Sequence, residues 1–268
     1  MSLRVRPHDP DRDGIVIEIT PQSAGWSHVG FKVARLDRGQ VCEGGDADRE
    51  TCLVVLAGSA DVEADGCMFD DVGGRASVFD DAPPGAVYVP AGSHYRLCAK
   101  TPVELAICSA PGKPGREPRQ IDPSTMSNEV RGQGTNRRFV RNILPETEAA
   151  DSLLVVEVIT PGGHWSSYPP HKHDTASVGE ETQLEETYYH RLNPPQGFAV
   201  QRVYTDDRSI DETVSVEDGD VVMIPRGYHP AGAPHGYDLY YLNVMAGPTR
   251  NWVFRNDPDH EWIVRKPQ

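Results

Sequence analysis

The sequence predicts an all-β protein built from two related β-barrels. Its 25 glycines and 23 prolines are scattered through 268 residues as turn residues, not gathered in one tract. Between them lie short runs rich in valine and isoleucine, and long helical patterns are few. The five-residue pattern Pro-x-Gly-x-His follows a valine-rich run at residues 90–94 and again at 225–229. This recurrence indicates that the second half repeats the architecture of the first.

Residues 1–113 are expected to form the first barrel. Short apolar stretches at 15–35 precede a strand, a glycine turn and a second strand at 52–66. A strand interrupted by "PAGSH" follows at 85–99, and the last strand, "VELAICSAP", ends near residue 111. No His-x-His pair lies upstream of His94, so we expect this barrel to hold no metal. Residues 114–138 are polar and rich in proline and glycine, which is typical of a linker or an extended arm.

Residues 139–268 are expected to form the second barrel. The strand candidates are "SLLVVEVIT" at 152–160, "LEETYYHRL" at 184–192 and "GFAVQRVYT" at 197–205. A strand interrupted by "PRGYH" spans 219–233, and "YDLYYLNVMAG" at 237–247 follows it. The order of strand, Pro-x-Gly turn, histidine and strand is the same as in the first half.

Charge and cysteine content limit the function classes. The formal net charge is −14, which argues against nucleic acid or an anionic membrane surface as a partner. No apolar run is long enough for a membrane span, and the first residues lack the apolar core of a secretory signal. We therefore expect a cytoplasmic protein. The five cysteines form no Cys-x-x-Cys pair, and free thiols are the expectation in a reducing compartment.

The second half contains a candidate metal site. His171 and His173 lie two residues apart in "YPPHKHD", and on an extended strand both side chains point to the same face. His229 follows the Pro-x-Gly turn, and either Glu185 or Glu186 supplies a carboxylate from the strand between them. Three imidazoles and one carboxylate suit Zn, Fe, Mn or Ni. Strand alternation leaves the choice of glutamate open, because Glu185 shares its face with Thr187 and Tyr189 while Glu186 shares its face with Tyr188 and His190.

Long runs of the second half resemble the cupin motifs of the 5-deoxy-glucuronate isomerase family of myo-inositol catabolism, which is related to the 4-deoxy-5-ketouronate isomerases. The runs are "SSYPPHKHD" at 166–174, "LEETYYHR" at 184–191, "PPQGFAVQRVYT" at 194–205, "DGDVVMIPRGYHP" at 218–230 and "GYDLYYLNVMAGPTRNWVFRNDPDHEW" at 236–262. The first half matches in outline only. The resemblance implies a bicupin of two jelly-roll barrels and an aldose–ketose isomerisation of 5-deoxy-glucuronate to 5-dehydro-2-deoxy-gluconate.

The resemblance also implies a ligand set and a partner. The metal pattern transfers to His171, His173, Glu185 and His229, where Glu185 is favoured because the family's ligand glutamate directly follows an apolar residue, here Leu184. It implies one divalent ion, which we expect to be zinc, with Mn, Fe and Ni as alternatives. The substrate is a small sugar acid. A homo-oligomer is expected, because exposed apolar strands of bicupins often pair between subunits.

Other residues of the second half are candidates for the remaining roles. The general base is unassigned, with Glu186, Tyr189, His190 and a hydroxide on the metal as candidates. A carboxylate substrate requires a guanidinium, for which Arg226 and Arg202 are the candidates, and Tyr228 and Tyr204 are candidates for binding hydroxyl groups. The alternative functions are an iron dioxygenase with the same ligands and a non-catalytic sugar-acid binder.

Overall fold

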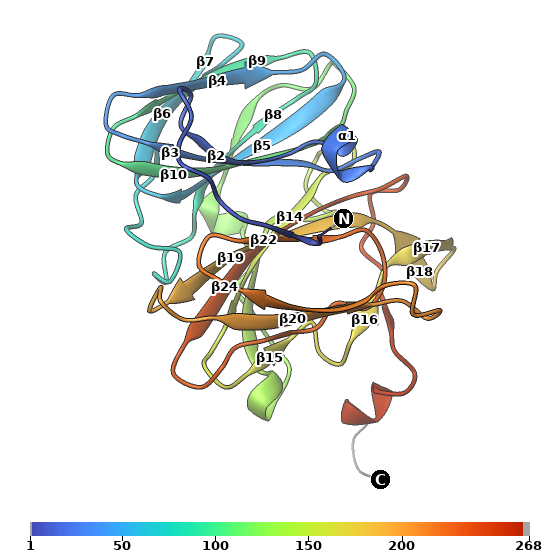
Figure 1. The fold of residues 1–268 in the computed structure, drawn as a ribbon. Coiled ribbons are helices and arrows are strands. Elements are labelled where there is room, and N and C mark those ends of the chain that lie inside the picture. Colours follow the sequence, from blue (N-terminus) through green and yellow to red (C-terminus); the bar gives the residue numbers. More distant parts are fainter. Residues whose placement is uncertain (1, 265–268) are drawn as a thin grey trace.

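The computed structural model describes residues 2–264, which form two β-barrels stacked on each other (Figure 1). In each barrel a large sheet lies toward the centre of the molecule and a small sheet lies outside it. The predicted all-β class is confirmed. Helical structure in the described residues is limited to α1 (Pro21–Ala24) and the 3-10 turns η1 (Pro123–Thr125), η2 (Gly134–Asn136) and η3 (Glu261–Ile263).

The first barrel consists of a six-stranded and a four-stranded antiparallel sheet. The large sheet has the order β11 (Arg119–Ile121), β8 (Gly85–Val89), β5 (Arg49–Ala57), β10 (Val103–Pro111), β3 (Gly30–Leu36) and β2 (Ile15–Ile19). The small sheet has the order β4 (Val41–Gly45), β9 (His94–Ala99), β6 (Ser59–Ala64) and β7 (Cys67–Gly73).

The second barrel consists of a seven-stranded and a four-stranded sheet, with two short ladders at its edge. The large sheet has the order β1 (Arg4–Val5), β22 (Val221–Ile224), β19 (Glu185–Asn193), β24 (Asp238–Ala246), β14 (Leu154–Thr160), β13 (Arg138–Leu144) and β12 (Glu129–Arg131). The small sheet has the order β15 (Trp165–Ser166), β23 (Ala231–Gly232), β20 (Ala199–Tyr204) and β21 (Asp211–Val216). The ladders pair β16 (His171–Lys172) with β25 (Arg255–Asn256), and β17 (Asp174–Ser177) with β18 (Glu181–Gln183).

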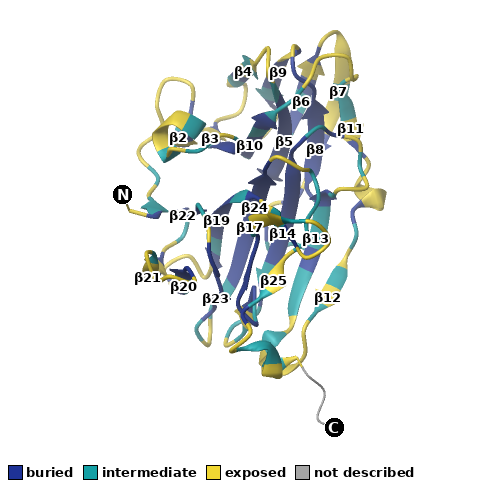
Figure 2. Cartoon of the chain, turned by 90° about the vertical axis from the view of Figure 1, so that its right-hand side faces the viewer, coloured by how far each residue is buried: buried dark blue, intermediate teal, exposed yellow. Residues whose placement is uncertain are grey.

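Three apolar cores hold the layers together. One core fills each barrel, and the third lies between the two large sheets, where Phe31 of the first half packs on Tyr189 of the second. The central strands are therefore buried on both faces, as their dark colour in Figure 2 shows. This explains why runs such as "TCLVVLA" are apolar almost throughout and lack the alternation of a half-exposed strand.

Two short segments cross the expected boundaries between the halves. Arg4–Val5, in the range expected for the first barrel, form β1 in the large sheet of the second barrel. Within residues 114–138, β11 pairs with β8 of the first barrel and β12 pairs with β13 of the second. The expected arm thus adds a strand to each large sheet. The division into residues 1–113, 114–138 and 139–268 stays a prediction.

A buried ionic cluster also links the two barrels. Arg75 of the first half donates hydrogen bonds of 3.1 and 2.9 Å to the two carboxylate oxygens of Glu157 in the second. The same carboxylate accepts hydrogen bonds from Arg141 and Tyr240. Burial is the largest single effect and lowers the pKa of Arg75, but the charges and hydrogen bonds of Glu157 and Tyr240 together outweigh it and the net pKa is raised. The cluster therefore depends on every charge keeping its partner.

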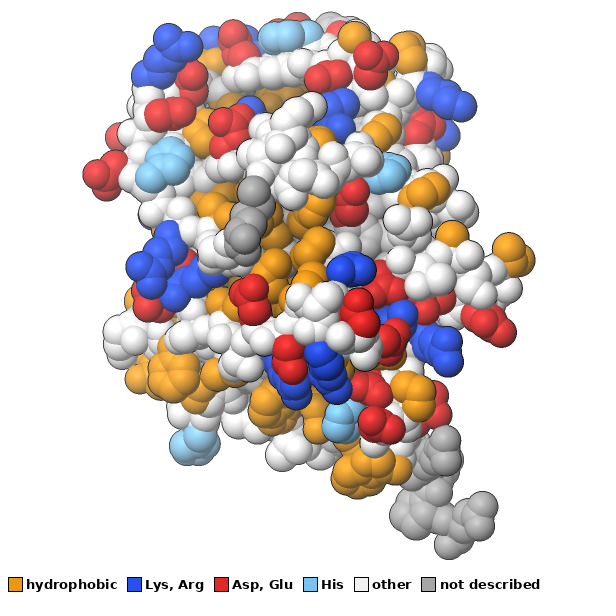
Figure 3. Space-filling model, turned by 45° about the vertical axis from the view of Figure 1, so that its right-hand side comes forward, with side chains coloured by type: hydrophobic (Ala, Val, Ile, Leu, Met, Phe, Trp, Pro, Cys, Tyr) orange, Lys and Arg blue, Asp and Glu red, His pale blue; other side chains and the backbone are white. Residues whose placement is uncertain are grey.

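The surface mixes acidic and basic side chains, with apolar ones gathered between the two barrels on the face drawn in Figure 3. All five cysteines are free, as expected. Within residues 2–264, the helices are too short to cross a bilayer.

Candidate metal centre

His173, Glu186 and His229 gather inside the second barrel, and each offers one ligand atom within 4.8 Å of the others. His173 directly follows β16, Glu186 lies on β19, and His229 follows the Pro-x-Gly turn after β22. Glu186 Oε2 lies 3.0 Å from His173 Nε2 and 3.2 Å from His229 Nε2. All three side chains are at most 2% exposed. They form the one such group of three among the described residues.

His171 stands beside this group. Its ring centroid lies 5.0 Å from that of His229 and 6.3 Å from that of His173, so both histidines of the His-x-His pair face the interior, as strand alternation predicts. Lys172 points the other way and pairs with Asp174. His171 also contacts Phe254, with ring centroids 4.5 Å apart. It is therefore positioned to add a fourth ligand.

The hydrogen bonds around the cluster fit a bound cation. His173 Nδ1 lies 3.3 Å from the Leu184 carbonyl oxygen, and His229 Nδ1 lies 2.8 Å from the Gly227 carbonyl oxygen. Because carbonyls only accept hydrogen bonds, both Nδ1 atoms carry a proton. His173 Nε2 lies within hydrogen-bonding distance of Glu186 Oε2 and can donate to it, whereas His229 Nε2 faces the same oxygen and is buried without a hydrogen-bond partner among the described residues. A divalent ion that replaced the His173 Nε2 proton would let both Nε2 atoms and the carboxylate act as ligands.

Burial governs the protonation of the imidazoles. It lowers the pKa of His171 well below the usual value, and the neighbouring His229 and His173 act in the same direction. It also lowers the pKa of His229 to about 4, although the charge of Glu186 opposes it. For His173 burial is the largest single effect and lowers the pKa, but the hydrogen bond to Glu186, the charge of Glu186 and backbone hydrogen bonds together outweigh it, and the pKa is raised. Near neutral pH, His171 and His229 are neutral, which is the form that binds metal.

The structure corrects the choice of glutamate. Glu185 does not join the cluster, because its side chain lies on the opposite face of β19, toward the first barrel. Its carboxylate accepts hydrogen bonds from the backbone N–H groups of Ser27, His28 and Val29 at 2.8, 2.9 and 3.0 Å. Glu186 shares the interior face with Tyr188, as alternation along the strand requires.

Replacing Glu185 by alanine should lower the free energy of unfolding by about 2 kcal/mol, because three backbone N–H groups, two of them partly buried, lose their charged acceptor. Urea unfolding measures this loss. Glu185→Gln keeps an acceptor oxygen and should lose less. Equal stability of the alanine variant and the wild type would contradict the assigned contact.

The other base candidates lie away from the cluster. Tyr189 faces the first barrel, where its hydroxyl donates a 2.7 Å hydrogen bond to Glu104. His190 faces the interior but is fully buried, and its Nε2 lies 3.0 Å from Gln201 Oε1. Burial lowers the pKa of His190 to about 4, partly offset by this hydrogen bond. Of the three base candidates, only Glu186 belongs to the cluster.

Since the pKa of His190 falls from 6.5 to about 4 on folding, the unfolded chain binds a proton that the folded protein excludes between these two values. The stabilisation is present above pH 6.5 and is lost as the pH falls toward 4. In His190→Gln, the decrease in unfolding free energy between pH 7 and pH 5 should be about 2 kcal/mol smaller than in the wild type. Urea titrations at both pH values test this, and identical decreases would show that His190 does not titrate as described.

The four residues expected to bind substrate lie outside the barrel interior. Arg202 pairs with Asp211, and the Tyr204 hydroxyl donates to Asp257. Tyr228 donates to Asp206, and the exposed Arg226 donates to Ser209. The alternation that places Gln201 and His229 inside puts Arg202 and Tyr228 on the outer face.

A cavity of about 520 Å³ opens beside the cluster. Its wall contains His171, Tyr188 and Tyr241, together with the guanidinium groups of Arg138 and Arg131. Sequence reasoning missed both arginines because both lie within residues 114–138, the expected linker, where the structure forms β12 and begins β13. The signal that would have found Arg138 is the alternation of Arg138, Val140 and Asn142 on one strand face.

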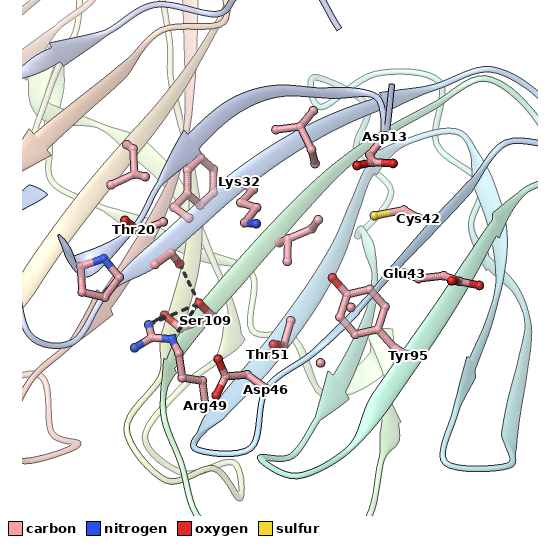
Figure 4. A pocket seen from close by; sticks show the side chains of 18 of the residues that line it. Asp13, Thr20, Lys32, Cys42, Glu43, Asp46, Arg49, Thr51, Tyr95 and Ser109 are labelled. Carbon is pink, nitrogen blue, oxygen red and sulfur yellow. Dashed lines mark hydrogen bonds between the residues drawn. The ribbon is translucent and has the colours of Figure 1, made fainter. Parts of the chain in front are cut away.

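The first barrel has a comparable pocket without such a cluster among the described residues. The pocket has a volume of about 720 Å³, and Arg49 in its wall donates to Ser109 and to the His28 carbonyl (Figure 4). Thr51 pairs with Val89, just before "PAGSH", as Glu186 pairs with Ile224 just before "PRGYH". Thr51 therefore holds the place of Glu186. The expectation of a metal-free first barrel stays a prediction.

Two stacked barrels, one of which encloses a cluster of histidines and one glutamate, define a bicupin with a candidate metal centre. The solved structures of Bacillus subtilis oxalate decarboxylase share this fold, with a TM-score of 0.64 over 94% of this chain and 78% of that one, at 14% identity. The model of the KduI/IolB family matches residues 3–263, and the chain belongs to this family.

Relatives within the family are similar over nearly the whole chain. The 5-deoxy-glucuronate isomerase of Geobacillus thermodenitrificans is 55% identical over 97% of this chain and 95% of its own length. That of Geobacillus kaustophilus is 54% identical over 98% and 95%. The crystal structure of an IolB-like protein from Salmonella typhimurium has a TM-score of 0.95 and 50% identity, covering 98% of this chain and 99% of that one.

Proposed function

We propose that this protein is a metal-dependent 5-deoxy-glucuronate isomerase that forms 5-dehydro-2-deoxy-gluconate in myo-inositol catabolism. The observation that carries the proposal is the 55% identity to a relative of that name over nearly the whole chain. The buried cluster beside a cavity supports it, because an aldose–ketose isomerisation needs a polarised carbonyl and a site closed to bulk water.

His171, His173, Glu186 and His229 would hold one divalent ion, for which zinc is our first choice. When bound, the ion supplies a Lewis acid that polarises the substrate carbonyl and acidifies the neighbouring C–H bond. The two carbonyls that accept from His173 and His229 hold these rings in the ligating tautomer.

The cavity wall supplies a hydrogen-bond donor. The Tyr188 hydroxyl oxygen lies 2.9 Å from the Ser167 hydroxyl oxygen, and the two groups form a hydrogen bond. Burial keeps the pKa of Tyr188 well above the usual range. It therefore stays protonated near neutral pH and can donate a hydrogen bond to a substrate oxygen. The isomerisation moves one hydrogen from C2 to C1 and one proton from the C2 hydroxyl to the C1 oxygen, so it is redox-neutral overall and requires no oxidant.

The test is an assay with 5-deoxy-glucuronate under strictly anaerobic conditions, before and after removal of metal by a chelator. We expect turnover without oxygen, loss of turnover on chelation and recovery with a divalent metal. Activity that requires oxygen would favour an iron dioxygenase. Binding of the sugar acid without turnover, with any divalent metal, would favour a binding protein. The cytoplasmic location and the homo-oligomer stay predictions.

A further inference from the structure

Arg138 presents an uncompensated positive charge to the cavity beside the cluster. It lies at the start of β13, and its Nη1 donates to the carbonyl oxygens of Asn136 and Tyr168 at 3.1 and 3.3 Å. Among residues 2–264, no carboxylate forms an ion pair with its guanidinium. Burial lowers its pKa, and the neighbouring Arg131 lowers it further. A partly buried charge without a counter-ion is costly unless a ligand supplies one.

Two other arginines of the second half have partners for their guanidinium groups and serve as a comparison. Arg131 also lines the cavity, but it is paired with Glu129 at 2.9 Å. Arg250 has no carboxylate partner within the described part of the chain, yet its three nitrogens all donate to backbone carbonyls. Toward the residues that the structure describes, Arg138 donates only through Nη1, so its Nε and Nη2 groups keep donors for a ligand. Nε and Nη2 are adjacent donors of the guanidinium fork, which matches a carboxylate.

The surroundings of Arg138 place this charge beside the metal candidate. Arg138 and His171 line the same cavity. The side-chain amide of Asn243 lines it as well, next to the Tyr188 hydroxyl. The remaining donors of Arg138 thus share a cavity with a ligand candidate and further polar groups, which fits an anionic, oxygen-rich molecule.

We propose that Arg138 binds the carboxylate of the sugar acid, so that the opposite, reacting end of the molecule lies at the histidine cluster. The inference rests on the proposed function. The inference makes Arg138, on β13, the residue that selects a sugar with a carboxylate. Arg138 takes this role in place of Arg226 and Arg202.

The test compares Arg138→Met, Arg138→Lys and the matched control Arg226→Met, each assayed with 5-deoxy-glucuronate and with the uncharged 5-deoxy-glucose. We expect kcat/KM for the acid to fall about 100-fold in Arg138→Met, mainly through KM, and about 10-fold in Arg138→Lys, which keeps the charge and loses the fork. Turnover of the uncharged sugar should change little, so discrimination between the two sugars is lost. Arg226→Met should match the wild type.

Metal content and the thermal midpoint of each variant exclude indirect effects through the cluster or the fold. If the wild type turns over the acid and Arg138→Met keeps its KM and its discrimination, the inference is wrong while the proposed function stands. If the wild type turns over neither sugar anaerobically, the proposed function is wrong, and the inference that rests on it is wrong as well. An equal loss for both sugars would assign Arg138 a structural role and overturn the inference.

Discussion

In Glu186→Gln, we expect bound metal to fall to trace levels and isomerisation to drop at least about 1,000-fold, which corresponds to about 4 kcal/mol of transition-state stabilisation. Glu186 Oε2 stands within 3.2 Å of both His173 and His229, so it is the anion that completes the cluster. Glutamine has the same size but lacks the charge, and its amide is a poorer ligand. Elemental analysis of the purified variant measures the metal, and the anaerobic assay measures turnover.

Glu185→Gln is the matched control, because it makes the same chemical change one residue earlier on the same strand. It should keep the metal and the activity, since Glu185 binds the backbone at 27–29 outside the barrel. His173→Ala and His229→Ala should lose metal as Glu186→Gln does. A metal-free Glu185→Gln next to a metal-bound Glu186→Gln would reverse the assignment.

In Glu157→Ala, we expect a loss of about 3–5 kcal/mol of unfolding free energy, because Arg75 would remain buried without its counter-ion. The Arg75 side chain is 0% exposed and that of Glu157 is 3% exposed, so water cannot replace the missing partner. The thermal midpoint should fall by about 10 °C. Calorimetry or circular dichroism measures this shift.

The control for this prediction removes both charges. The double variant Arg75→Met, Glu157→Leu has apolar side chains in place of both buried charges, so neither charge is left without a partner. It should recover much of the stability that Glu157→Ala loses. Arg141 is partly exposed and can turn to water. If Glu157→Ala loses less than about 1 kcal/mol, the link between the barrels is weaker than its geometry indicates.

The sequence predicted the fold because local signals agreed with it. The strand runs, the glycine and proline turns and the repeated Pro-x-Gly-x-His pattern match β5 to β10 and β19 to β24. The pairing of β1 with β22 was not predictable, because two residues carry no periodicity and their partner lies more than 200 residues away. The same holds for β12, a three-residue strand in a polar segment.

Within the site, the two histidines of His-x-His and His229 were placed correctly in the barrel interior, but the glutamate was not. Strand β19 is buried on both faces, so polar and apolar residues do not alternate along it. The sequence therefore does not show which of its faces points into the second barrel. In a half-exposed strand, a charged residue such as Glu185 would mark the face that points to solvent. Here the Glu185 side chain instead contacts the backbone of the first barrel. Arg138 was missed for a related reason, since the role proposed for it depends on a cavity lined by several segments that lie far apart in the sequence.

The central claim is that His173, Glu186 and His229 of the second barrel, with His171 as the fourth ligand, bind one ion. The most direct test is an X-ray fluorescence scan of crystals of the holoenzyme, followed by an anomalous difference map at the absorption edge found. We predict a single peak about 2 Å from Nε2 of His173, Nε2 of His229 and a carboxylate oxygen of Glu186. The claim is contradicted if the crystals, supplied with divalent metals, show no peak there or a peak bound by Glu185.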